Sequence, residues 1–384
     1  MRRLNNLVTL FSAMFAFFFG CFLTNTLVNI DKTPTKHSMP GSAHHNGEYF
    51  LLILIYSAPS YFERRETIRE TWLKLSNPIR HNKYPEEFIY LPQYDARGFL
   101  QMEDVKDQIN RLSHFKDWLS HEDENDANNR RVINSKYLFV IGTKGLSNTL
   151  LQEINKEQQS NNDLLLLHDV YDSYSNLTNK VLRSVEAVMN QLSFDYILKA
   201  DDDTYVKLDY LINELLSYDR KLIRNFEQYK NSPIPQLYWG FFNGRAQIKT
   251  RGQWREPNFY LCDRYLPYAL GGGYIFSRGI AQFIESNSRQ LSTYVSEDIS
   301  FGTWISALRN IYRRHDVRFD TGYMPRKCRD YHLVLHKRTK EQMYDLFEKN
   351  FCTFEATNEQ MVKRPMEYFY DWSKTADKCC DTIS

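Results

Sequence analysis

The chain has 384 residues, and 49 Lys and Arg against 47 Asp and Glu leave a formal net charge of only +2 at pH 7. Such a balanced charge gives no basic footprint and excludes nucleic acid as a partner. The length suits one large α/β enzyme, and an aromatic content of 15% suits a sizeable core.

The N-terminus has the pattern of a membrane anchor. Residues 7–28 contain no charged side chain and are long enough for a bilayer, which a helix of about 20 residues can cross. Arg2 and Arg3 precede them, so the positive-inside rule predicts a cytoplasmic tail at 1–6, a signal-anchor at 7–28 and a lumenal body. A cleaved signal peptide is the alternative, but its apolar region is usually about 7–15 residues long. The polar residues 29–47 are interpreted as a stem.

From residue 48 onward, apolar runs typical of buried strands alternate with segments of helical character. Uninterrupted apolar strands between helices predict an α/β fold in which a parallel sheet is covered on both faces. We therefore expect a single domain over 48–384. The predicted strands are 49–56, 136–142, 163–168 and 195–200, and the predicted helices are 63–75, 148–159 and 177–192.

A polar insertion at about 77–131 interrupts this alternation. It contains the acidic stretch HEDEND at 121–126. Polar, charged segments between regular elements usually run over the surface. The insertion is therefore interpreted as a solvated loop without a site of its own.

The six cysteines fit a secretory compartment, where disulfides persist. Cys21 falls in the predicted anchor and five others fall in the lumenal body. Because five is odd, at most two bridges form within the chain and one thiol is left over, and the sequence does not choose the pairing. The five are Cys262, Cys328, Cys352, Cys379 and Cys380.

One N-glycosylation sequon stands out, Asn176-Leu177-Thr178. Such a sequon predicts a glycan on Asn176 in a lumenal protein. Its alternative is the N-terminus of a helix, and the two interpretations are compatible.

Three adjacent carboxylates at 201–203, the acidic triplet, directly follow the predicted strand 195–200. Like charges in contact disfavour one another's ionisation, so the triplet is costly unless a counter-charge is present. A divalent cation supplies one, and carboxylate oxygens suit Mg²⁺ or Mn²⁺, which also hold phosphate oxygens. Because ligands bind beyond the carboxyl ends of strands in open α/β sheets, a nucleotide diphosphate is the expected occupant. The alternative, a cap for a helix at about 208–215, needs only one Asp.

Four motifs occur in an order that resembles the β1,3-galactosyltransferase family (glycosyltransferase family 31). They are RRETIRETW at 64–72, the acidic triplet, GGGY at 271–274 and SEDI at 296–299. The resemblance covers about residues 50–340 and implies a metal-dependent sugar transferase of the GT-A (Rossmann-like) fold, anchored in the Golgi membrane as a type II protein. Mn²⁺, or Mg²⁺, is the implied cofactor and UDP-galactose the implied donor.

Three further segments narrow the resemblance within that family. YWGFFNGR at 238–245, LPYALGGGY at 266–274 and the tail 370–380 resemble members that build the linkage region of glycosaminoglycans. They imply transfer of galactose in β1,3 linkage to the galactose of a galactosyl-xylosyl linker on a proteoglycan core. Relatives share the four motifs, so a β1,3-galactosyl- or N-acetylglucosaminyltransferase acting on glycoprotein or glycolipid glycans is the alternative.

The resemblance also assigns roles around the cation. Asp203 is the implied metal ligand, Asp201 faces the ribose, and Asp202 completes the donor side. His336 follows an apolar run at the position of the family's late His ligand, and its alternative is an ordinary partly buried histidine. Weaker candidates for this ligand are His315 and His332.

Three arginines lie just after the first predicted strand. Helical spacing puts Arg65 and Arg69 on one face, and with Arg64 they could fork onto the uridine or the diphosphate of the donor. The alternative is a solvated helix in which Glu66 and Glu70 are their partners.

Asp298 is the implied general base. Transfer from an α-linked nucleotide sugar to a β-linked product inverts the anomeric carbon, which takes one displacement and one base for the acceptor hydroxyl proton. In the family, the Asp of this Glu-Asp pair has that role, and Glu297 is expected to orient groups around it. The alternative for Asp298 is an N-cap of a helix at 299–308. A glycoside hydrolase would instead need two carboxylates that flank the scissile bond.

The acceptor side is expected beside the glycine motif. Gly272 and Gly273, with Gly271, let the backbone approach a sugar closely and tolerate positive φ, and a strand bulge is the alternative. Trp239 and Tyr274 could stack on sugar faces, although most aromatic side chains belong to the core. Further candidates for stacking are Phe241 and Trp254.

Overall fold

The computed structural model describes residues 47–76, 83–121, 133–257, 262–324, 326–352 and 367–383. The predicted signal-anchor at 7–28 and all of the stem except Gly47 lie outside these residues. Within the described part of the chain, no helix combines the length and the apolar character that a membrane span requires.

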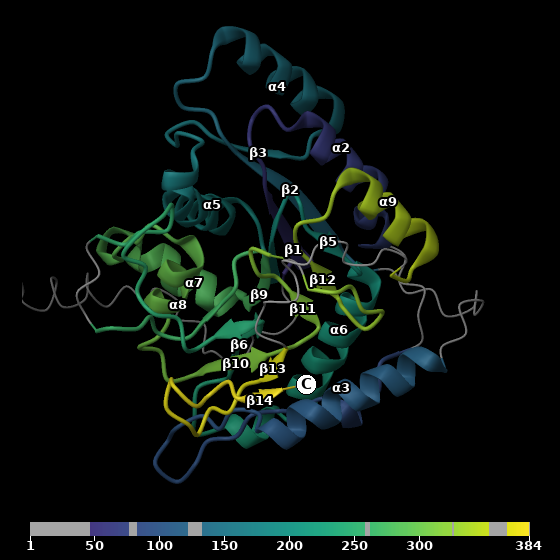
Figure 1. The fold of residues 1–384 in the computed structure, drawn as a ribbon, viewed down its shortest axis with the longest axis vertical. Coiled ribbons are helices and arrows are strands. Elements are labelled where there is room, and N and C mark those ends of the chain that lie inside the picture. Colours follow the sequence, from purple (N-terminus) through teal and green to yellow (C-terminus); the bar gives the residue numbers. More distant parts are fainter. Residues whose placement is uncertain are drawn as a thin grey trace, which may run out of the picture. The chain divides into compact units, whose positions relative to one another are not determined.

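A seven-stranded sheet forms the centre of the described body, with the strand order β10-β6-β9-β4-β1-β2-β3 (Figure 1). β9 alone in this sheet runs antiparallel to its neighbours β4 and β6, so the expected parallel sheet is in fact mixed. The strands are β1 (Tyr49–Tyr56), β2 (Ser135–Gly142), β3 (Leu164–Leu167), β4 (Phe194–Asp201), β6 (Gln236–Gly240), β9 (Gly273–Ser277) and β10 (Ile311–His315).

Burial explains why β1 lies inside the sheet. Its sequence YFLLILIY is apolar on both faces, and every residue after Tyr49 is buried. It pairs in parallel with β2 on one side and β4 on the other. A strand with two apolar faces is stable only where helices cover both sides of the sheet. The alternating pattern of the sequence therefore predicted this part of the fold correctly.

Helices cover the sheet as the sequence pattern predicts, with α5, α7 and α8 gathered on one side and α6 and α3 on the other (Figure 1). The helix expected at 63–75 ends early and continues as a 3-10 turn, η1 (Trp72–Ser76). The α-helices are α2 (Phe62–Glu70), α3 (Val105–Ser120), α4 (Asn148–Asn161), α5 (Leu177–Gln191), α6 (Leu208–Arg224), α7 (Arg278–Asn287), α8 (Glu297–Trp304) and α9 (Lys340–Lys349). Short 3-10 turns are η2 (Glu86–Phe88), η4 (Tyr174–Asn176), η5 (Phe226–Tyr229) and η6 (Ser288–Gln290).

A small second sheet, in the order β11-β12-β5, continues directly from the central one. β5 (Tyr205–Val206) begins four residues after β4 ends, and it pairs antiparallel with β12 (Val334–Leu335). β11 (Phe319–Asp320) completes the sheet. Two further pairs of short strands are β7 (Phe242–Asn243) with β8 (Tyr268–Ala269), and β13 (Tyr368–Phe369) with β14 (Thr382–Ile383).

The insertion is not the solvated loop that its polar sequence suggested. It contains the four-turn helix α3, which buries Gln108, Arg111, Leu112 and Phe115. A polar residue can be buried when a specific partner satisfies it, and polarity alone does not reveal such partners. Residues 122–126 of the acidic stretch lie outside the described residues.

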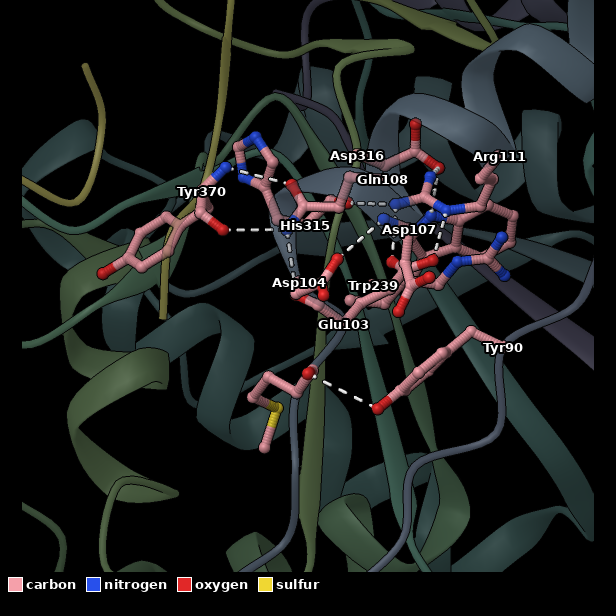
Figure 2. A network of polar contacts seen from close by, with 12 residues as sticks. Tyr90, Glu103, Asp104, Asp107, Gln108, Arg111, Trp239, His315, Asp316 and Tyr370 are labelled. Atoms are coloured by element: carbon pink, nitrogen blue, oxygen red, sulfur yellow. Dashed lines mark hydrogen bonds and ion pairs between the residues drawn. The ribbon is translucent and has the colours of Figure 1, made fainter. Parts of the chain in front are cut away.

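Buried ion pairs attach α3 to the body (Figure 2). The Arg111 guanidinium lies 2.7 Å from carboxylate oxygens of both Glu103 and Asp316, and it also donates to the His315 carbonyl. One turn earlier, the Gln108 side chain donates to the Tyr370 carbonyl and accepts from the Tyr370 N–H. The insertion is therefore held to β10 and to the C-terminal tail by paired polar groups.

The cysteines form two bridges, Cys328–Cys352 and Cys379–Cys380. Among the described residues Cys262 is the free cysteine, and it is exposed. This agrees with the expectation of at most two bridges and one remaining thiol.

Replacing Arg111 with Ala should lower the free energy of unfolding by about 3–5 kcal/mol, because Glu103 and Asp316 lose a buried partner. Arg97→Ala is the matched control, since Arg97 forms an exposed pair with Asp95 that is worth at most about 1 kcal/mol. Urea unfolding followed by circular dichroism measures both changes. Equal effects of the two substitutions would contradict a role of Arg111 in holding α3.

Candidate functional site

The acidic triplet sits where the two sheets meet. Asp201 is the last residue of β4, and Asp202 and Asp203 form the turn that leads into β5. β5 pairs with β12, and His336 is the next residue after β12. The Arg338 N–H donates to the Asp203 carbonyl at 2.8 Å and closes the far end of this pairing. A histidine 133 positions away in the sequence is thus brought to the triplet by backbone hydrogen bonds.

Asp201, Asp203 and His336 form a group that could hold a metal ion. One ligand atom from each lies within 4.8 Å of the others. His336 Nδ1 is 2.9 Å from the Gly322 carbonyl, and this contact turns Nε2 toward the carboxylates, 3.0 Å from Asp203 and 3.4 Å from Asp201. Nε2 is buried but makes no well-directed hydrogen bond. Three ligand atoms that face a common point, two oxygens and one imidazole nitrogen, fit Mn²⁺ or Mg²⁺.

The opposite charges of His336 and the two carboxylates shift one another's pKa values toward the charged forms. Burial acts to lower the pKa of His336, but the carboxylates of Asp201 and Asp203 outweigh it and raise this pKa to about 9. Burial would raise the pKa of Asp201, yet Lys199 and His336 hold it well below its usual range. The two carboxylates therefore stay ionised, and a cation that binds them must compete with the proton on His336.

The glycine motif allows the site's side chains to lie directly on the backbone. A Cβ at Gly272 would be 2.5 Å from His336 Cγ, and one at Gly271 would be 3.3 Å from a carboxylate oxygen of Asp298. A Cβ at Gly273 would meet the Val334 side chain at 2.9 Å. None of the three has positive φ, so that part of the expectation was wrong. Close approach is what requires glycine here.

Asp298 lies in the first turn of α8, with its carboxylate facing the glycine motif. One oxygen accepts a hydrogen bond from the Gly271 N–H at 3.0 Å and the other from the Ile299 N–H at 2.9 Å. Ser296 occupies the N-cap position, so the cap interpretation of Asp298 was wrong. Burial raises the pKa of Asp298 to about 6. The side chain is half-buried, so its carboxylate can meet a ligand and is more basic than an ordinary aspartate.

Lys199 connects the cation group to the Glu-Asp pair, and its role was missed in the sequence. Its ammonium lies 2.7 Å from Asp201 and 3.3 Å from Glu297, and it donates to the Gly271 carbonyl. Glu297 is buried and accepts a hydrogen bond from the Tyr274 hydroxyl, and burial raises its pKa to about 7. The signal was available, because Lys199 and Asp201 are two residues apart on a strand and share a face.

Two cations flank the other side of the triplet. Arg64 pairs with Asp202 at 2.9 Å, as expected for a residue on the donor side, and Lys337 pairs with Asp203 at 2.8 Å. Both line a cavity of about 430 Å³ next to the triplet, between α2 and the start of α9. Lys337 was not singled out in the sequence, although it follows His336 directly.

Arg65 and Arg69 share a helix face as expected, but this face does not meet the triplet. Arg65 is buried and lies 2.6 Å from Glu157, and Arg69 pairs with the same carboxylate and with Asp163. Of the two partners that the alternative proposed, only Glu66 contacts Arg69, at 3.1 Å. Their guanidinium groups hold α2 to α4 and β3.

Most aromatic candidates for sugar stacking are in the core. Trp239 is fully buried and donates to Asp316 at 2.8 Å, and Phe241 and Tyr274 are buried as well. For these three the stacking prediction was wrong, because their rings have no accessible face. Trp254 is half-buried and keeps part of its ring accessible.

Asn176 lies at the N-terminus of α5, as one interpretation of its sequon predicted, and its side-chain amide donates to the Tyr171 carbonyl at 2.8 Å. Glycosylation of this residue stays a prediction. The weaker histidine candidates lie elsewhere: His315 contacts the Tyr368 carbonyl and His332 contacts Glu367.

Comparison with known proteins identifies relatives with related activities. The family model described as Galactosyltransferase matches residues 115–316. Beta-1,3-galactosyltransferase 6 of Mus musculus is 33% identical over 367 residues, which cover 94% of this chain and 92% of the mouse protein. UDP-GalNAc:beta-1,3-N-acetylgalactosaminyltransferase 2 of Homo sapiens is 33% identical over 153 residues, covering 40% of this chain and 28% of that protein. The chain therefore belongs to the galactosyltransferase family and is a glycosyltransferase.

Proposed function

We propose that this enzyme transfers galactose from UDP-galactose, with inversion, in β1,3 linkage to the galactose of a galactosyl-xylosyl linker on a proteoglycan. The observation that carries the chemistry is the half-buried Asp298 carboxylate, joined through Gly271 and Lys199 to the group of Asp201, Asp203 and His336. Similarity over 94% of the chain to a β1,3-galactosyltransferase supports the donor and the linkage. The acceptor rests on the resemblance of segments 238–245, 266–274 and 370–380 to linkage-region enzymes.

The donor side is built for a nucleotide diphosphate. Asp201, Asp203 and His336 would hold Mn²⁺, or Mg²⁺, and the ion would neutralise negative charge on the diphosphate as the sugar leaves. Arg64 and Lys337 add positive charge to the adjacent cavity, whose volume of about 430 Å³ lies in the range of small-molecule sites. The mixed sheet with the triplet at the end of β4 is the arrangement that we propose as a GT-A fold.

The transfer step needs one base and one displacement. The acceptor hydroxyl attacks the anomeric carbon, the bond from that carbon to the diphosphate breaks, and Asp298 takes the hydroxyl proton. Hydrogen bonds from the Gly271 and Ile299 N–H groups fix the carboxylate before substrate binds. Glu297 is buried against Tyr274 and Lys199, so we assign it the positioning of Lys199 and not the proton transfer.

The alternative function has the same transfer chemistry but a different donor sugar or acceptor glycan. A relative named for transfer of N-acetylgalactosamine matches 40% of the chain, so the shared motifs do not fix the donor. A β1,3-galactosyl- or N-acetylglucosaminyltransferase acting on glycoprotein or glycolipid glycans therefore stands as the second candidate.

We further propose that the enzyme is a single-pass type II protein of the Golgi membrane, with its body in the lumen. The uncharged residues 7–28 behind Arg2 and Arg3 support the anchor. The disulfides and the sequon at Asn176 suit an oxidising, glycosylating compartment.

A donor and acceptor screen tests the substrates. With Mn²⁺ present, UDP-galactose and a galactosyl-β1,4-xyloside should give a β1,3-linked product, while N-acetylglucosamine-terminated acceptors should give little. Excess chelator, or Asp203→Ala, should abolish transfer, whereas Asp202→Asn should retain cation binding because Asp202 pairs with Arg64 and lies outside the ligand group. Product linkage is determined by NMR. Preference for N-acetylglucosamine acceptors would favour the alternative, and full activity in chelator would contradict the cation site.

Asp298→Asn should retain UDP and Mn²⁺ binding but lose turnover by about 10²–10⁴-fold, the usual contribution of a general base. Glu297→Gln is the matched change one residue away and should lose less, since Glu297 is not assigned to proton transfer. Steady-state kinetics measure turnover, and calorimetry measures binding. A larger loss in Glu297→Gln than in Asp298→Asn would make Glu297 the base.

The pH dependence follows from the raised pKa of Asp298. A base must be ionised, and burial raises this pKa to about 6, so kcat/KM should be flat above that pH and fall about tenfold per pH unit below it. Glu297 is next to Asp298 and titrates nearby, so the acidic limb belongs to the pair. Mn²⁺ must be saturating at every pH, because the proton on His336 competes with it. Full activity down to pH 4.5 would contradict this assignment.

A further inference from the structure

Trp254 contacts one aromatic side chain from each of two other segments of the described structure. Trp254, between β7 and β8, donates a hydrogen bond from its indole to the hydroxyl of Tyr174 in η4. The Trp254 ring also lies 5.1 Å from the ring of Tyr323, centroid to centroid, at an angle of 60°. We call these three residues the aromatic cluster.

The aromatic cluster is attached both to the cation group and to the segment that carries Asp298. Tyr323 directly follows Gly322, whose carbonyl lies 2.9 Å from His336 Nδ1. Two residues after Trp254, Glu256 accepts a hydrogen bond at 2.7 Å from the Val295 N–H, three residues before Asp298. The cluster is therefore fixed relative to the cation group and to the proposed base by short runs of backbone.

The carboxylates of the candidate site also act on the Tyr174 hydroxyl. Burial raises the pKa of its hydroxyl, and the carboxylates of Asp298, Asp201 and Glu297 add to the rise, with an opposing contribution from the hydrogen bond to Trp254. The pKa shift of Tyr174 therefore agrees with the contacts that attach the cluster beside the candidate site.

The cluster is exposed in a way that the core aromatics are not. Tyr174 keeps 54% and Tyr323 keeps 59% of its surface accessible. Single exposed apolar residues are ordinary. A patch of exposed aromatic rings beside a site, however, indicates that a ligand binds there. Trp and Tyr present an apolar ring with a polar edge, which matches a sugar that has an apolar face and hydroxyls around it.

The acceptor sugar fits the aromatic cluster better than the donor nucleotide does. The cavity that carries the cations Arg64 and Lys337 includes none of the three aromatic residues in its lining. The cluster is attached instead beside Asp298, the group that must meet the acceptor hydroxyl. In galactose the axial 4-hydroxyl leaves one face of the ring apolar, so this sugar can lie flat on an aromatic ring.

We propose that Tyr174, Trp254 and Tyr323 hold the acceptor, with the terminal galactose stacked on their rings and its 3-hydroxyl directed at Asp298. The proposal rests on the proposed function and adds the residues that recognise the acceptor. Stacking positions the hydroxyl before reaction, and such positioning contributes to rate as well as to binding.

The test is a kinetic comparison of Trp254→Ala and Tyr323→Ala with the wild-type chain. Each substitution should raise the KM for the galactosyl-β1,4-xyloside acceptor by about tenfold or more, the effect of losing an aromatic contact worth about 1.4 kcal/mol. The KM for UDP-galactose and the slow hydrolysis of UDP-galactose without acceptor should be unchanged. Trp254→Phe, which keeps a ring, should restore most of the acceptor affinity.

The matched control is Phe99→Ala, which removes an equally exposed aromatic ring, 63% accessible, from the insertion. It should change neither KM, and thermal unfolding should confirm that each variant is folded. An active wild type with an unchanged acceptor KM in both alanine variants would overturn the aromatic cluster as the acceptor site. A folded wild type that cannot use UDP-galactose with this acceptor would overturn the proposed function, and the cluster's role with it.

Discussion

The site depends on the antiparallel pairing of β5 with β12. Backbone hydrogen bonds from Lys207 to Leu333 and from Arg338 to Asp203 join two segments that are more than 120 residues apart. The pairing fixes the turn that carries the triplet and brings His336 to it in the same register. Without this pairing, the triplet would be three like charges at the end of a strand. With it, two of the three share one imidazole.

Each carboxylate of the acidic triplet then has its own counter-charge. Lys199 neutralises Asp201 from within the sheet, Arg64 neutralises Asp202, and Lys337 neutralises Asp203 from the surface. Asp298 accepts hydrogen bonds from two backbone N–H groups, and the charge of Lys199 also acts to lower its pKa. Burial still raises the pKa of Asp298 to about 6, whereas the pKa values of Asp201 and Asp203 lie below their usual range, so these two carboxylates stay ionised.

Local patterns in the sequence were sufficient for β1, β2, β3 and β4, the triplet and the Glu-Asp pair, because each depends on neighbouring residues. The strands β6, β9 and β10 of the same sheet were not predicted. Contacts between residues that are far apart in the sequence could not be predicted from it. Helical spacing put Arg65 and Arg69 on one face, but their partner Glu157 is about 90 residues away. Trp239 looked like a stacking residue until β6 proved to be an inner strand. The antiparallel direction of β9 has no local signal, because it is fixed by the connections around it.

The insertion is the clearest case, and it also bears on the site. Arg111 of α3 pairs with Asp316 (Figure 2), and Asp316 pairs in turn with Arg318 at 2.6 Å. Asp316 and Arg318 lie just before β11. Asp320 at the end of β11 accepts the His336 N–H through its carbonyl. Buried ion pairs thus connect the insertion to the segment that leads into β11. A polar residue of the segment that was interpreted as a solvated loop therefore helps to hold β11, which contacts His336 through its backbone.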